Sequence, residues 1–149
     1  MALFDVATEG KIKNHLLRQM ATVRVYYEIM LSDENNKKFL YEIQKTESNY
    51  NSLYDIVHRG YEIWLNEYEI YCTEGIFRTN IIAEFGARNE LLIRYLQKEL
   101  IISPQDLAIA IISIAPKLFN INPLVTDSLI LKSAQLFESL DYSGIKFLI

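Results

Sequence analysis

Histidine, cysteine and neighbouring carboxylates are the side chains of this sequence that could carry out chemistry. His58 lies three residues after Asp55 and four before Glu62, so a helix would place both carboxylates beside its ring. One histidine with two carboxylates could be part of a metal site, but carboxylate-bridged helical sites need paired Glu-x-x-His motifs, and the sequence has none. We therefore expect an ordinary helical histidine and no bound metal.

The other two candidates are a histidine and the single cysteine. His15 lies among basic residues that would stabilise a phosphoryl group on its ring, although no ATP-binding or receiver motif accompanies it. Cys72 is next to Thr73 and Glu74, and acidic neighbours disfavour the reactive thiolate. No phosphate-binding glycine loop, nucleophile elbow or zinc signature is present. The sequence therefore predicts a protein that is not an enzyme and uses no cofactor.

Apolar residues recur at helical spacing along the chain, and no stretch alternates as a strand does. We expect a first helix from about Thr8 to Leu31 and later ones over 37–73, 76–100 and 104–116, with a last helix opened by Asn122-Pro123. The segment 107–115 is apolar on all sides and belongs at the centre of a bundle, and Pro116 should end or kink it. The prediction is a single all-α domain over residues 1–149, a helical bundle of five to seven helices with a buried central helix near 104–116.

The segment 37–73 carries the most regular pattern. Ten positions step alternately by three and four residues, which is a heptad seam. The polar run 48–52 favours a break into two helices, and one continuous helix is the alternative. The seam positions are Leu40, Ile43, Glu47, Tyr50, Tyr54, Val57, Tyr61, Trp64, Tyr68 and Tyr71.

Acidic charge and aromatic residues concentrate in the same region. Residues 39–77 hold seven acidic and two basic side chains, six of the ten tyrosines and the single tryptophan. Tyrosine is common at protein interfaces, so the seam is either the edge of the core or a surface for a partner. If it is a partner surface, the expected contact residues are Tyr54, Tyr61, Trp64, Tyr68, Glu62 and Glu69.

Charge and hydropathy narrow the classes of function. A net charge of −4 argues against nucleic-acid binding, and no apolar run approaches the roughly 20 residues of a membrane span. One cysteine fits a reducing, cytoplasmic location. We expect a helical protein–protein interaction module, such as an adaptor, scaffold or inhibitor, that binds another protein or forms a homodimer. The alternatives are a bundle that binds a small apolar ligand between segments 76–100 and 104–116, and an enzyme or phosphorelay protein centred on His15 or His58.

Overall fold

The computed structural model describes residues 12–46 and 50–139, apart from the side chains of residues 46 and 50–54. This part of the chain is a bundle of packed helices without strands, as the sequence predicts. The helices in chain order are α2 (His15–Ser32), α3 (Glu34–Thr46), α4 (Tyr50–Glu67), α5 (Glu74–Leu96), α6 (Pro104–Ile112), α7 (Ile114–Leu118) and α8 (Pro123–Ser139).

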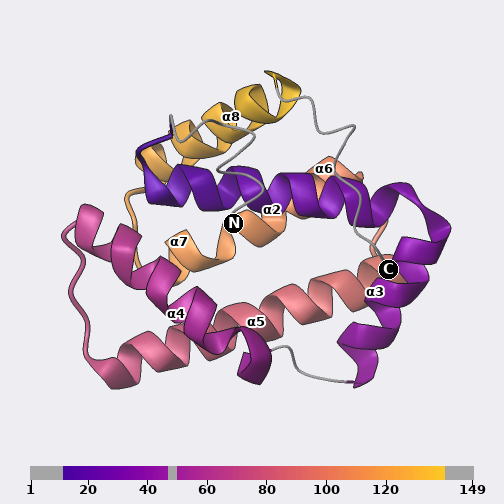
Figure 1. The fold of residues 1–149 in the computed structure, drawn as a ribbon, viewed down its shortest axis with the longest axis horizontal. Helices are drawn as coiled ribbons and strands as arrows, with labels where there is room; N and C mark the ends of the chain where they lie inside the picture. Colours follow the sequence, from indigo (N-terminus) through magenta and orange to yellow (C-terminus); the bar gives the residue numbers. More distant parts are fainter. Residues whose placement is uncertain (1–11, 47–49, 140–149) are drawn as a thin grey trace.

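The helices are stacked around α2, which packs against α8 on one side and against α6 on the other (Figure 1). Helix α5 lies beyond α6 and α7 and contacts both. Helices α3 and α4 each contact α2 and α5, at opposite ends of the bundle (Figure 1). Helix α6 is therefore central, with Leu107, Ala108, Ile111 and Ile112 buried, although Ile109 reaches the surface.

Local sequence signals set most of the helix ends. Ser103 caps α6, as expected: its Oγ accepts a hydrogen bond from the backbone N–H of Asp106 at 3.0 Å. The expected start of the first helix near Thr8 is wrong for the described residues, because 12–14 are not helical. Asn14 caps α2 instead, and its Oδ1 accepts from the backbone N–H of Leu17 at 2.7 Å.

Two of the expected helices are interrupted in the structure, and the second interruption is explained by a proline. The segment 37–73 forms two helices, α3 and α4, with residues 47–49 outside the description. The predicted helix over 104–116 ends at Ile112 rather than at Pro116. Proline lacks the N–H that would bond to the carbonyl of Ile112, so the helical pattern is interrupted one turn before it and restarts as α7.

The core is built around aromatic rings from three parts of the chain. Trp64 of α4 meets the ring of Phe119, which follows α7, at a centroid distance of 5.5 Å. Phe77 of α5 and Tyr61 of α4 pack on the same phenylalanine. A second buried cluster joins α2, α3, α5 and α6 through Tyr27, Leu31, Leu40, Leu92 and Leu107.

No helix in the described ranges is both long enough and apolar enough to cross a lipid bilayer.

Candidate interaction surface

The tyrosine-rich face of α4 turns inward at its centre. The side chain of Tyr61 is 2% exposed and that of Trp64 is 0% exposed. The indole Nε1 of Trp64 donates a hydrogen bond to Oε1 of Gln19 on α2 at 2.9 Å. Both side chains are therefore covered in this structure, whereas the predicted partner contact would need them exposed. Helices α2 and α5 both contact α4, so Tyr61 and Trp64 of the seam belong to the core.

The remaining predicted contact residues differ in their exposure to solvent. Tyr68 is half-buried, and its hydroxyl accepts a hydrogen bond from Nδ2 of Asn14 at 2.8 Å. Glu62 and Glu69 are exposed, and Glu69 lies beyond the end of α4 with a left-handed φ of 53°. Tyr54 belongs to α4, but its side chain lies outside the described part of the structure. Among the predicted contact residues whose side chains are described, two are thus buried, one is half-buried and two are exposed.

Each of the two histidines pairs with a glutamate, His15 between two helices and His58 within α4. Nδ1 of His15 pairs with Oε1 of Glu67, and the backbone N–H of His15 donates to Oε2 of the same carboxylate at 3.1 Å, which ties α2 to the end of α4. Nδ1 of His58 is 3.4 Å from Oε2 of Glu62, and its ring packs edge-on against Phe77 at 4.6 Å. Within the described ranges, no three histidine, cysteine or acidic residues gather as metal ligands would.

An unexpected ion pair occupies the interior. Glu84 and Arg88 lie one turn apart on α5, with Oε2 of the glutamate 3.3 Å from a terminal guanidinium nitrogen. Desolvation raises the pKa of Glu84, and the charge of Arg88 offsets only part of that effect. The signal for it was present in the sequence, because Arg88 occupies a position on the apolar stripe of its helix.

The ion pair borders the place where an apolar ligand pocket was expected. The cavity between α5 and the helices α6 and α7 has a volume of about 30 Å³, and Glu84 and Arg88 line it together with Tyr61 and Ile111. This volume accommodates a water molecule rather than an organic ligand. This cavity is therefore too small for the apolar ligand that the sequence suggested as an alternative.

A second buried arginine attaches α8 to the bundle. Nε of Arg24 on α2 donates to Oγ of Ser133 at 2.7 Å, and one of its terminal nitrogens donates to the backbone carbonyl of Ile130 at 3.2 Å. Burial lowers the pKa of Arg24. Since a buried charge requires such partners, Arg24 fixes which face of α8 meets α2.

The opposite face of α8 presents two large apolar side chains to solvent. Leu124 is 78% exposed and Leu131 is 62% exposed, and their spacing of seven residues places them on the same side of the helix. Leu131 borders an open groove of about 640 Å³ between α8 and the α6–α7 segment, which Ile109, Ile121 and Ile130 also line. A pair of exposed leucines at heptad spacing beside an apolar groove is typical of a surface that another helix covers.

The charges beside the leucines are arranged to suit a second copy of the same helix. Asp127 and Lys132 are exposed on opposite sides of the leucine pair and are five residues apart. In a parallel pair of helices, residues at this spacing face each other across the interface. Two copies of α8 in parallel would therefore bring each Asp127 near the other copy's Lys132.

The comparison with known proteins finds no matching family model, no similar curated protein and no similar solved structure.

Proposed function

We propose that this protein is a non-enzymatic helical interaction module that self-associates through the exposed face of α8. The observation that carries the proposal is the pair Leu124 and Leu131, two large apolar side chains exposed at heptad spacing. The surface differs from the tyrosine-rich face of α4 that the sequence suggested, whereas the class of function is the same. A second copy is the favoured occupant because Asp127 and Lys132 complement each other in a parallel pair.

The expected affinity is low. Two leucines per copy and one helix face bury less than the roughly 800 Å² per partner that stable interfaces use. The positions between the leucines that would face the second copy, Ser128 and Gln135, are polar and add little. We therefore expect a dissociation constant weaker than about 1 μM.

Light scattering over a concentration series tests the proposal. The wild-type chain should change from monomer to dimer as its concentration rises, and the double variant Leu124→Glu/Leu131→Glu should stay monomeric throughout. The matched control is Ile56→Glu/Ile82→Glu, which places the same charges at comparably exposed apolar positions on α4 and α5. This control should dimerise like the wild type.

Charge exchange tests the parallel arrangement separately. Asp127→Lys and Lys132→Asp should each weaken the dimer, and the two substitutions together should restore it. A wild-type chain that remains monomeric at millimolar concentration would exclude self-association. An interaction that survives the loss of both leucines would assign it to a different surface.

A further inference from the structure

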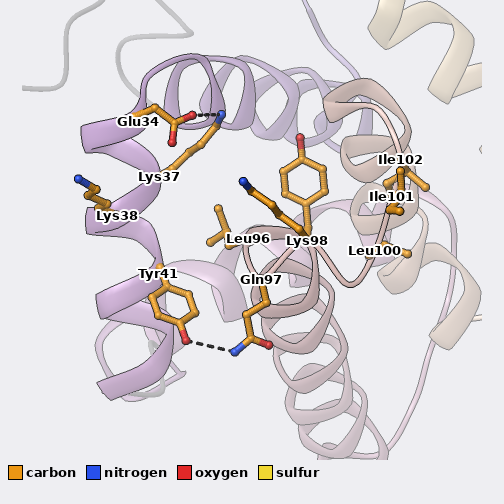
Figure 2. Close-up of a pocket in the computed structure, with 11 residues that line it drawn as sticks. Glu34, Lys37, Lys38, Tyr41, Leu96, Gln97, Lys98, Leu100, Ile101 and Ile102 are labelled. Carbon is orange, nitrogen blue, oxygen red and sulfur yellow. Dashed lines mark hydrogen bonds and ion pairs between the residues drawn. The ribbon is translucent and has the colours of Figure 1, made fainter.

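A second cavity lies far from α8, between α3 and the C-terminal end of α5 (Figure 2). Its volume is about 600 Å³, within the range of small-molecule sites. The apolar part of its lining comes from Leu96 and the segment 100–102 that leads to α6. Across from it, α3 contributes Lys37 and Tyr41. The pocket therefore combines an apolar wall with a polar one.

The charge of the pocket is opposite to that of the whole protein. Three lysines and one glutamate line it, in a chain whose net charge is −4. Nζ of Lys37 is 2.7 Å from Oε1 of Glu34, whereas Lys98 has no ion-pair partner among the described residues. Figure 2 shows Lys98 extending from the end of α5 toward α3, where Lys37 lies beside Glu34. Positive charge that Glu34 offsets only in part thus lies beside the apolar wall.

The opposite end of the pocket is fixed by a hydrogen bond between the same two helices. Nε2 of Gln97 donates to the hydroxyl of Tyr41 at 3.1 Å (Figure 2). This contact connects α3 to the residue that follows α5. It joins the two walls at this end of the pocket.

The backbone at Lys98 is a further indication that its side chain has a role. Lys98 has a left-handed φ of 62°, a conformation that glycine adopts at lower cost. It terminates α5 in the usual way, with the backbone N–H of Glu99 donating to the carbonyl of Arg94 at 2.9 Å. Glycine would serve this turn better than lysine, and unfavourable backbone conformations cluster at functional sites.

We propose that this pocket binds a small amphipathic carboxylate. The carboxylate lies between Lys98 and Lys37, and its apolar chain lies against Leu96, Leu100 and Ile102. A single negative charge suits the site, because Glu34 pairs with Lys37 and Figure 2 shows Lys38 pointing away from the other two lysines. The site is independent of the α8 surface and adds a ligand to the proposed interaction module.

Calorimetric titration with decanoate, kept below its micellar concentration, tests the proposal. Decanoate should bind saturably, whereas decanol lacks the charge and acetate lacks the chain, so both should bind much more weakly. Lys98→Gly should weaken decanoate binding about tenfold or more, as expected for the loss of a hydrogen bond to a charged group. This variant retains the left-handed turn, so a loss of binding cannot be attributed to unfolding.

The control and a second readout locate the binding. Lys13→Gln removes one positive charge from an exposed position near the start of α2 and should leave the affinity unchanged. Amide NMR shifts on adding decanoate should concentrate in residues 34–41 and 96–102. Absent or non-saturable binding, or equal affinity in Lys98→Gly, would overturn the proposal. Binding to anionic phosphatidylglycerol vesicles without binding to free decanoate would also overturn it, in favour of a membrane surface.

Discussion

The substitution Arg88→Met tests whether each charge of the buried ion pair on α5 offsets the cost of burying the other. Methionine keeps an unbranched apolar side chain of similar reach and removes the charge. The side chain of Glu84 is only 5% exposed, so without Arg88 its carboxylate stays buried without that countercharge. Removing one member of such a pair costs about 3 kcal/mol of unfolding free energy. That is a large part of the roughly 5–15 kcal/mol that stabilises a typical domain.

The opposite substitution should cost less, because the two partners differ in exposure. Arg88 keeps 21% of its side chain exposed, so its charge retains some contact with water after Glu84→Gln. We expect that variant to lose about 1–2 kcal/mol. The double variant should be more stable than the sum of the two losses predicts, by about 1 kcal/mol or more. Urea unfolding followed by the fluorescence of the buried Trp64 measures all four proteins.

The cost of Arg88→Met should also depend on pH. Burial already raises the pKa of Glu84 above its ordinary 4.5, and without Arg88 the pKa rises further. A carboxyl group with a raised folded-state pKa holds its proton more tightly in the folded protein. Its stabilising contribution is therefore complete below the unfolded pKa and is lost as the pH rises through the folded pKa.

Arg88→Met should consequently be only mildly destabilising near pH 4 and reach its full cost near pH 7. The comparison uses wild type and variant at the same pH, so that other titrating groups cancel. An equal cost at both pH values, or strict additivity in the double variant, would refute the reasoning that a charge is stranded in the core.

Two further predictions concern the core and the end of α5. Trp64→Ala should lower the unfolding free energy by about 3–5 kcal/mol, because the indole is fully buried and hydrogen-bonded to Gln19. A variant that is equally stable but associates less well would instead indicate that Trp64 contacts a partner. Lys98→Gly should leave the stability unchanged or raise it by up to about 1 kcal/mol, since glycine relieves the left-handed conformation. Glu69→Gly, at the corresponding left-handed residue after α4, should behave in the same way in urea unfolding, and a clear loss of stability in both would contradict this account of the helix ends.

The helices could largely be predicted from the sequence because their signals are local. Ser103 with Pro104 and Asn122 with Pro123 mark helix starts that the structure confirms. The break between α3 and α4 was favoured by the polar run 48–52, and the fold has separate helices on either side of it. The interruption before Pro116 follows from its missing N–H, which leaves the carbonyl of Ile112 without a helical hydrogen-bond partner.

The environment of the tyrosine-rich face of α4 could not be predicted, because it depends on what packs against that face. Tyrosines at seam positions suit either an interface or a core edge, and only the position of α4 between α2 and α5 decides for Tyr61 and Trp64. Glu84 and Arg24 were missed for a related reason. A charged residue beside an apolar stripe suggests a position at the edge of the core. Its burial becomes clear only from its partner, which is Arg88 for Glu84 and Ser133 for Arg24.

Helix α8 shows how a buried charge can determine which surface remains exposed. The helix has leucines on more than one side, and the spacing of Val125, Leu129, Ser133 and Leu136 favours burial of the side that carries Leu129. Arg24 needs the hydroxyl of Ser133 and the carbonyl of Ile130, so α8 can dock on α2 only with that side inward. Leu129 is then buried, and Leu124 and Leu131 are left in solvent. The polar contact that secures α8 is thus the reason that an apolar face is available for a second copy.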